Sequence, residues 1–315
     1  MDMKCAFCGG TDFNIDLKYN LLCCKQCGVC IPNTVLIGDK INNPDDFVIV
    51  GGILKKYKGS DTNVIVPSSV CEIGKGAFEC NDYITTVIIP EGVTHIHKNA
   101  FYGCYNLVSV KIPYSVTYIG ESAFSTCHAM ESVIIPGGVR TMEESAFSWC
   151  KRLKTVVIED GVTTISAHAF EHCKKLTDVA IPDSVTYIGI QAFYCCKSLR
   201  HINLPKNLPM LEYGVFAQCS SLEELILPEN TKRINDCNDA HCFFGCDSLL
   251  RIVYPPDFNE RGCFGPSSER MRLLSIGYCP FCMVKLPRFG YGNRCKKCGR
   301  SYKPPITKEQ LNAMD

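Results

Sequence analysis

The stretch AFSTCHAMESVIIPGGVRTMEESAFSWC, residues Ala123 to Cys150, contains the same short phrase at both ends. In each copy an alanine and a phenylalanine are followed, after two variable residues, by a cysteine. The phenylalanines of the two copies, Phe124 and Phe147, are 23 residues apart. A period of this length is too short for a globular domain and is typical of repeat units that stack on one another.

The phrase recurs along most of the chain. Its phenylalanines are separated by six steps of 23 residues and a last step of 27, at Phe78, Phe101, Phe124, Phe147, Phe170, Phe193, Phe216 and Phe243. A cysteine follows three residues after every phenylalanine except the first, at Cys104, Cys127, Cys150, Cys173, Cys196, Cys219 and Cys246. Asn81 takes the cysteine position in the first copy.

The residues between two phrases predict short strands. Val133 and Ile135 recur with the two-residue period of a strand, and Pro136 then ends the stretch because proline cannot extend a hydrogen-bonded ladder. A second extended stretch, Val116 to Ile119 in another copy, predicts an opposite wall, with the phenylalanine turned inward. One unit cannot bury its own apolar face, so the units are expected to stack and their strands to form parallel sheets.

The full pattern C-x-x-L-x-x-V-x-I-P-x-x-V-x-x-I-x-x-x-A-F resembles the BspA-like, or Treponema pallidum type, leucine-rich repeat family, from roughly Val64 to Phe258. The resemblance implies a right-handed, mainly β solenoid of about eight 23-residue units. Gly51 to Pro67 resembles the hairpin that caps such solenoids. Three local departures are Glu159 in place of a strand-ending proline, Thr231 in place of an apolar residue, and four extra residues before Phe243.

In leucine-rich repeats generally, one position per turn holds asparagine or cysteine because the side chain points inward and meets backbone groups. Asn81 and the seven cysteines that follow the later phenylalanines fit this rule. We therefore expect these cysteines to be a buried packing ladder rather than disulfides or metal ligands.

Composition agrees with a folded protein of 315 residues, since 46% are hydrophobic and 21% charged. No run of 18 apolar residues is present, and the first residues lack the pattern of a secretory signal. We therefore expect a cytoplasmic protein with no membrane span. The 23 cysteines then indicate metal ligands and buried thiols.

Both ends of the chain carry paired C-x2-C motifs. Fifteen residues separate the two pairs at the start and twelve separate those at the end. Four thiolates in two such knuckles suit a tetrahedral zinc ion with no open position, so we predict two structural zinc ribbons. The predicted ligands are Cys5, Cys8, Cys24 and Cys27 at the start, with Cys23 and Cys30 as substitutes, and Cys279, Cys282, Cys295 and Cys298 at the end.

These motifs predict an ordered series of segments. They are an N-terminal zinc ribbon (1–32), a linker (33–47), an N-terminal cap (48–63), BspA-like repeats (64–264), a cap or linker (265–277), a C-terminal zinc ribbon (278–303) and a tail (304–315).

The C-terminal ribbon is basic. Arg261 to Lys308 contains eleven lysines or arginines against one acid, Glu269. Aromatic residues are interspersed, which is the composition of a nucleic-acid contact surface. The alternative is that the lysines are solvated and the aromatics form the small core of the ribbon.

No active site is apparent, because the chain lacks a phosphate-binding glycine loop and a G-x-S-x-G nucleophile motif. His168 and His172 lie beside Cys173, but they fall at the turn of a repeat. The insertion holds another group of possible metal ligands, at Cys237, His241, Cys242 and Cys246. Cys246 already belongs to the ladder and the other three fall in an irregular loop, so we do not expect a metal site there. We therefore predict that the protein is not an enzyme.

One row of side chains is expected to point outward from the sheet. Seven of its nine members are apolar: Ile65, Ile88, Lys111, Ile134, Val157, Ala180, Asn203, Ile226 and Val253. The adjoining row is polar: Thr86, Ser109, Ser132, Thr155, Asp178, His201, Glu224 and Arg251. An apolar stripe beside a polar one predicts a docking surface for a protein, a peptide or a second copy of the chain. The alternative is that β-branched residues simply favour strands.

The sequence therefore favours a non-enzymatic protein-interaction or scaffolding module with structural zinc. Two alternatives stay open. The family resemblance implies a cell-surface, adhesin-type role, because many members are surface proteins of bacteria or protists. The basic C-terminal ribbon indicates a nucleic-acid-associated protein.

Overall fold

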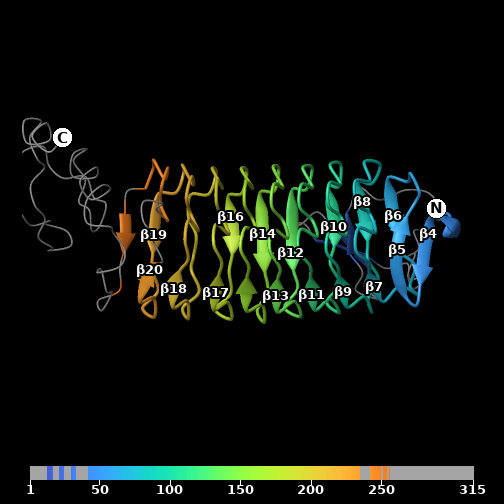
Figure 1. Cartoon of the computed structure of the whole chain (residues 1–315), viewed down its shortest axis with the longest axis horizontal. Coiled ribbons are helices and arrows are strands. Elements are labelled where there is room, and N and C mark those ends of the chain that lie inside the picture. The colour runs from blue at the N-terminus through green and yellow to red at the C-terminus, as the bar shows by residue number, and fades with distance from the viewer. Residues whose placement is uncertain are drawn as a thin grey trace, which may run out of the picture.

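The structure, a computed structural model, is an elongated stack of turns (Figure 1). It describes residues 42–234, 242–249, 251–253 and 255, together with the backbone of three short N-terminal strands. These are β1 (Phe13–Asp16), β2 (Leu21–Cys24) and β3 (Cys30–Pro32), which form an antiparallel sheet in that order. Cys23 and Cys30 are opposite each other in its register.

One wall of the solenoid is formed by strands of three or four residues, which we call the long-strand wall. Its strands are β6 (Asn63–Ile65), β8 (Thr86–Ile88), β10 (Ser109–Lys111), β12 (Ser132–Ile135), β14 (Thr155–Ile158), β16 (Asp178–Ala180), β19 (Glu224–Ile226) and β21 (Arg251–Val253). They pair in parallel as β6–β8–β10, β12–β14–β16 and β19–β21. Equivalent residues lie opposite each other, as Val133 and Val156 do.

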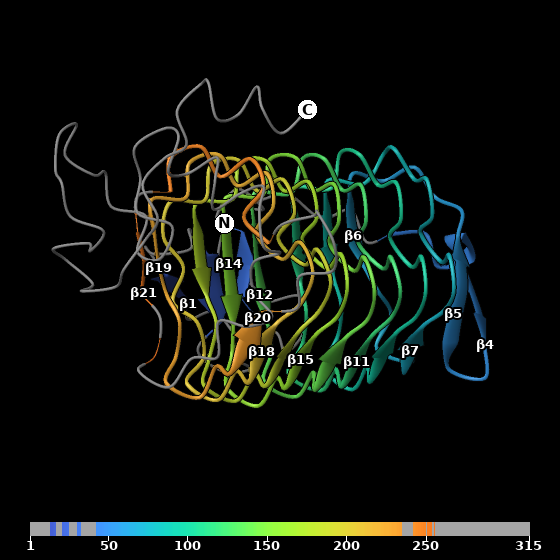
Figure 2. The same cartoon turned by 60° about the vertical axis from the view of Figure 1, so that its left-hand side comes forward.

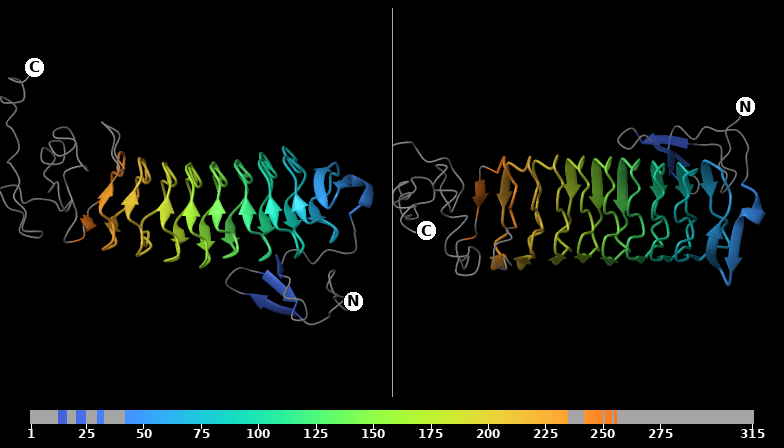
Figure 3. Two further views of the ribbon diagram at one scale, coloured as in Figure 1. Left: turned by 60° about the horizontal axis from the view of Figure 1, so that its bottom comes forward. Right: turned by 45° about the horizontal axis from the view of Figure 1, so that its top comes forward.

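The second wall is formed by two-residue strands, and we call it the short-strand wall. Its strands are β7 (Glu72–Ile73), β9 (His95–Ile96), β11 (Tyr118–Ile119), β13 (Thr141–Met142), β15 (Thr164–Ile165), β17 (Tyr187–Ile188), β18 (Met210–Leu211) and β20 (Arg233–Ile234). The first six continue one parallel sheet, and β18 pairs with β20. Figures 2 and 3 show the two walls running along the length of the solenoid. The predicted mainly β solenoid with parallel strands is confirmed.

A hairpin closes the N-terminal end of the short-strand wall. Its strands β4 (Phe47–Val50) and β5 (Ile53–Tyr57) are antiparallel, and β5 pairs in parallel with β7. Gly51 and Gly52 form its turn with φ of 57° and 77°, a backbone conformation that glycine adopts without strain. A 3-10 turn, η1 (Pro44–Asp46), leads into the hairpin.

The exposed edge of the long-strand wall is also covered at this end. The side-chain oxygen Oδ1 of Asn42 accepts a hydrogen bond of 2.7 Å from the backbone N–H of Ile65 in β6. The Asn42 amide nitrogen donates to Asp61 and to the backbone carbonyl of Asn63. These contacts use backbone groups that would otherwise be free to pair with another chain.

The phenylalanines form one continuous stack between the walls. All eight phenylalanines of the repeat contribute, with ring centroids 4.7 Å apart at Phe78–Phe101 and 6.5 Å apart at Phe216–Phe243. Tyr57 and Phe47 of the cap extend the stack by two rings. The sequence pattern did not reveal these two, because neither follows the Ala-Phe phrase.

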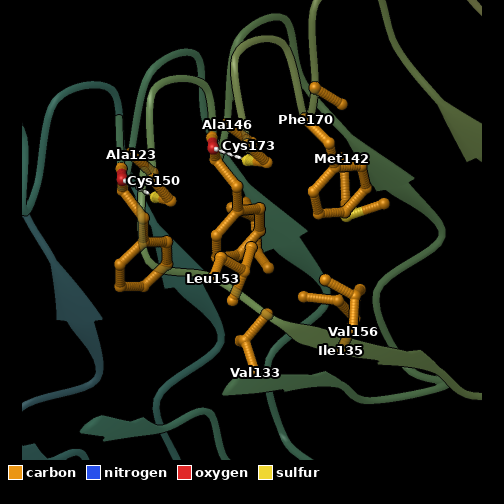
Figure 4. Packing of buried hydrophobic residues seen from close by; sticks show 14 of the residues in the cluster. Ala123, Val133, Ile135, Met142, Ala146, Cys150, Leu153, Val156, Phe170 and Cys173 are labelled. Carbon is orange, nitrogen blue, oxygen red and sulfur yellow. Dashed lines mark hydrogen bonds between the residues drawn. The ribbon is translucent and has the colours of Figure 1, made fainter. Parts of the chain in front are cut away.

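The cysteine ladder is confirmed as an inward-facing feature of the turns. Each of the seven thiols donates a hydrogen bond of 3.0 to 3.3 Å to the carbonyl oxygen of the phenylalanine one turn earlier. Figure 4 shows this contact for Cys150 and Cys173. Asn81 serves the first turn, because its amide donates to the Gly59 carbonyl and its oxygen accepts from the N–H of Ile84. The thiols therefore link successive turns.

Two of the departures from the repeat pattern form hydrogen bonds that their positions require. The Glu159 carboxylate accepts hydrogen bonds from the N–H of Gly137 and the hydroxyl of Tyr114, so it ties together loops of neighbouring turns. Thr231 is buried, and its hydroxyl donates to the Leu208 carbonyl at 2.7 Å. Each polar side chain therefore forms hydrogen bonds with neighbouring groups. An apolar residue or a proline at the same position could not form them.

The Ala-Phe segments follow an unusual backbone path, because two residues of each turn have positive φ. The first of these positions holds Gly76, Asn99, Ser122, Ser145, His168, Gln191 and Gly214; the second holds Cys80, Gly103, Thr126, Trp149, His172, Cys195, Gln218 and Gly245. Backbone N–H groups at these positions donate to the next turn, as Trp149 does to the Glu171 carbonyl at 2.7 Å. The left-handed residues thus extend hydrogen bonding between turns beyond the strands.

Candidate interaction surface

The predicted outward row lies on the outer face of the long-strand wall. In β12, Val133 and Ile135 are buried while Ile134 between them is half-buried, and β14 repeats the pattern with Val157. This alternation follows from the two-residue period of a strand. The outward placement of the row therefore follows the sequence prediction along most of the wall.

Exposure changes along the row. Ile88 is an exception to the prediction, because it is only 5% exposed and cannot contact a partner in this arrangement. Strand β3 of the N-terminal sheet contacts β10, the neighbour of β8, so the chain itself covers this end of the face. Ala180 and Asn203 are exposed, and Ile226 is 58% exposed.

Two further members of the row have different surroundings. Lys111 is half-buried, and its ammonium group lies 3.8 Å from a carboxylate oxygen of Glu91. Val253 is the last residue of β21, and its side chain lies outside the described residues. Ile65, the first member of the row, is half-buried next to the cap. Beyond Lys111, the accessible part of the row runs from Ile134 to Ile226.

A groove of about 470 Å³ crosses this accessible part. It is lined by three equivalent residues from each of three successive turns: Thr155, Val156, Val157, Asp178, Val179, Ala180, His201, Ile202 and Asn203. We call it the wall groove. The outward row supplies Val157, Ala180 and Asn203, and the adjoining polar row supplies Thr155, Asp178 and His201. The structure thus brings together the two rows that the sequence singled out.

The groove lies where the hydrogen-bonded sheet is interrupted. Among the described residues the wall pairs from β12 to β16 and resumes between β19 and β21, while residues 201–203 belong to no strand. The turns are also farther apart here, since the Phe193 and Phe216 rings are 5.8 Å apart against 4.9 Å for Phe101 and Phe124.

The polar groups of the groove suit recognition. Asp178 accepts a hydrogen bond of 2.7 Å from the Thr177 hydroxyl, and a ring nitrogen of His201 lies 3.9 Å from the Glu223 carboxylate. Neither contact resembles a nucleophile beside a base, the arrangement that covalent catalysis requires. The groove therefore has the composition of a binding surface, with apolar positions beside a few hydrogen-bonding groups.

The possible metal-ligand clusters within the repeats have structural roles in the described part of the chain. Cys242 and Cys246 of the insertion each donate to a backbone carbonyl at 3.0 Å, those of Glu212 and Phe216, while Cys237 and His241 lie outside the described residues. His168 and His172 lie at the positive-φ turn positions, next to the buried ladder residue Cys173. No group of three or more potential ligands is placed to hold a metal within the described ranges.

The predicted zinc ligands fall almost wholly outside those ranges. Cys24 is the last residue of β2, opposite Phe13, and the substitute positions Cys23 and Cys30 are paired across β2 and β3. The remaining predicted ligand positions, at both ends of the chain, are not described. The zinc ribbons accordingly stay a prediction.

With the turns, the ladder and the wall in view, comparison with known proteins identifies the family. The model of the BspA type leucine-rich repeat region matches six copies over residues 56–177 and 142–264. This chain belongs to the BspA-type leucine-rich repeat family. No curated protein matches it.

Two solved structures share the fold. The Treponema pallidum leucine-rich repeat protein is 26% identical, with a TM-score of 0.50 over 67% of this chain and 91% of that one. A leucine-rich repeat protein from Eubacterium ventriosum is 22% identical, with a TM-score of 0.51, and the match covers 67% of this chain and half of that chain. These likenesses support the BspA-type solenoid. No helix of the described part is long and apolar enough to cross a membrane.

Proposed function

We propose that this BspA-type chain is a non-enzymatic protein-interaction module, whose partner is a protein or peptide segment bound on the outer face of the long-strand wall. The observation that carries the proposal is the wall groove, in which Val157 and Ala180 offer apolar contact beside the polar Thr155, Asp178 and His201. Apolar surface contributes binding energy, and the polar groups select the partner and its orientation.

The solenoid suits this role because its binding residues stand on a rigid support. Val156 and Val179 lie under the groove and belong to the core, which also contains the phenylalanine stack. A preorganised surface binds more tightly, because less conformational entropy is lost when the partner arrives. The same sheet face also offers a surface to a second copy of the chain, which would appear as a dimer in solution.

The test is selection of binding peptides from a random library on the intact chain. Adding two lysines in the groove, Ala180→Lys with Asn203→Lys, is expected to weaken the selected peptides about tenfold or more, because each ammonium group must lose water to be covered. Both residues are exposed, so the fold should tolerate the change. Tyr187→Lys with Ile190→Lys is the matched control, since both residues are exposed but lie outside the groove, and the change adds the same charge. Equal affinity for all three proteins would exclude this surface.

We further propose that the two ribbons hold structural zinc, with four cysteines each and no open coordination position for catalysis. We also propose a reducing, cytoplasmic setting for the protein, because the cysteine ladder and the zinc ribbons both need their cysteines reduced. Fractionation of the source cells tests the location, and recovery of the chain from the cell surface would contradict it.

A further inference from the structure

A second surface is formed by the loops that follow three successive ladder cysteines. Lys151 follows Cys150, Lys174 and Lys175 follow Cys173, and Lys197 follows Cys196. The core rings of these turns are 5.7 Å and 5.5 Å apart, so the lysines recur at about the same interval. We call the four lysines the lysine ridge. None of them lines the wall groove.

Trp149, the single tryptophan of the chain, lies at this ridge. Its φ is 60°, in the left-handed region, where Gly103 and Gly245 stand in other turns. It is 37% exposed, and its ring stacks on His172 with centroids 4.0 Å apart. The same backbone conformation occurs at the equivalent position of the other described turns, so the exposed aromatic ring, and not the φ, distinguishes Trp149.

The ridge is electrostatically unbalanced. The ammonium groups of Lys151 and Lys174 lie 5.7 Å and 5.9 Å from the Trp149 ring centroid. Within the described residues no carboxylate lies within 4 Å of the four ridge ammonium groups, whereas the nearby Arg152 lies 3.6 Å from Glu131.

Two histidines beside the ridge have lowered pKa values, to which the lysines contribute after burial. Burial, followed by the charge of Lys151, lowers the pKa of His128 below its ordinary value. For His172, burial is again the largest cause of a lowered pKa, with Lys174 and Lys197 acting in the same direction and Glu171 opposing them. The charges of the ridge lysines therefore lower the pKa values of the two neighbouring histidines.

We propose that Trp149 and the lysine ridge bind an acidic peptide segment. Alternate side chains of an extended peptide recur about every 6.6–6.8 Å, close enough to the turn spacing for three glutamates to meet three turns through flexible lysine stems. His172 and the two ammonium groups already occupy the faces of the Trp149 ring. Two positive charges beside the ring favour a partner that brings carboxylates.

The test uses the fluorescence of Trp149 in the full chain, titrated with the peptide Ser-Glu-Ser-Glu-Ser-Glu-Ser. A saturable change in fluorescence is expected, and added salt should weaken the binding. Lys174→Glu with Lys175→Glu should reduce the affinity about tenfold or more, because it replaces attraction by repulsion. Lys58→Glu with Lys75→Glu, at exposed positions near the cap, gives the same change in net charge and should bind as the unaltered chain does. Circular dichroism checks that both variants are folded.

Three results would overturn the proposal. They are the absence of a saturable fluorescence change, equal affinities of the two double variants, and tighter binding of an RNA heptamer or heparin than of the peptide. The Ala180→Lys with Asn203→Lys variant should keep full affinity for the acidic peptide, so failure of the groove and failure of the ridge can be told apart.

Discussion

At the scale of single residues, the ladder cysteines act through their hydrogen bonds. Each thiol donates to the carbonyl oxygen of a phenylalanine in the preceding turn, as Cys150 does to Phe124 at 3.2 Å. The Phe124 oxygen also accepts a hydrogen bond of 3.4 Å from the backbone N–H of Cys127. Burial without a hydrogen bond is costly for such a group. The cysteine therefore contributes both packing and satisfaction of the backbone.

Cys150→Ala should lower the free energy of unfolding by about 1–3 kcal/mol, because it removes a buried sulfur and the shorter of the two hydrogen bonds that the Phe124 carbonyl accepts. Urea denaturation measures the change. Cys71→Ala is the control, since Cys71 is exposed, and its effect should stay within about 0.5 kcal/mol. Equal losses in the two variants would show that the hydrogen bond contributes nothing.

The ladder also predicts sensitivity to alkali. Burial raises the pKa of Cys104 to about 12 from an ordinary value of 9.0. Above pH 9 the unfolded chain loses this proton while the folded chain keeps it, so stability is complete below pH 9 and falls as the pH rises toward 12. Denaturation at pH 7.5 and pH 10 should show a smaller loss for Cys104→Ala than for the unaltered chain. An identical loss in both would contradict the raised pKa.

The sequence was sufficient to predict whether a side chain points inward or outward when this depends only on its position in the repeat. The phenylalanines, the ladder cysteines and the outward Ile134 recur with the period, and the structure places them accordingly. Ile88 could not be placed correctly, because its burial depends on segments far away in the chain. The sequence contains the lysines of the ridge directly after three successive ladder cysteines. They were missed because they stand at a variable position of the repeat, and the sequence prediction used the constant positions.

At the scale of elements, the turn through the Ala-Phe phrase combines strain with hydrogen bonding. Ser145 has a φ of 58°, while Ser148 in the same turn is buried and its hydroxyl lies 2.9 Å from that of Ser125. The two serines therefore have opposite requirements, although they are three residues apart. Only the first occupies a position where glycine is favoured.

Ser145→Gly should be at least about 1 kcal/mol more stable than Ser148→Gly, because the first change relieves left-handed strain and the second removes a buried hydrogen bond. Thermal and urea unfolding of the two variants give the comparison. The reverse order, or equal stabilities, would show that positive φ imposes no strain in these turns.

The strands of the two walls could be predicted from the sequence to different extents. Alternating apolar residues ended by proline predicted the strands of the long-strand wall, and Val116 to Ile119 predicted a second wall. The interruption at residues 201–203 could not be foreseen, since His201 to Asn203 follows the same alternation as its neighbours.

At the scale of the whole molecule, the stack is tighter toward its N-terminal end. Ring separations are 4.7 to 5.0 Å from Phe78 to Phe147 and 5.5 to 6.5 Å from there to Phe243. Repeat proteins are stabilised mainly by contacts between neighbouring turns. Local unfolding can therefore begin at the turns whose contacts are weakest. Hydrogen–deuterium exchange should therefore be faster at residues 201–203 than at β12 and β14, and uniform exchange would contradict this.

We expect the two zinc ribbons to unfold independently of the solenoid. Metal analysis should find about two zinc ions per chain, and chelation should remove them and unfold the ribbons, because segments this short depend on metal to fold. Trp149 fluorescence, which reports on the solenoid, should stay unchanged. Metal content near zero would contradict the ribbons, and a shift in fluorescence would contradict their independence.

The central claim is that partners bind on the wall groove, and photo-crosslinking tests it most directly. A photoreactive phenylalanine analogue is placed at Ala180, in the groove, or at Tyr187, on the opposite wall. Each intact protein is then irradiated with a peptide selected for binding. The account predicts an efficient crosslink from position 180 and little from position 187. A crosslink from position 187 with none from position 180 would contradict it.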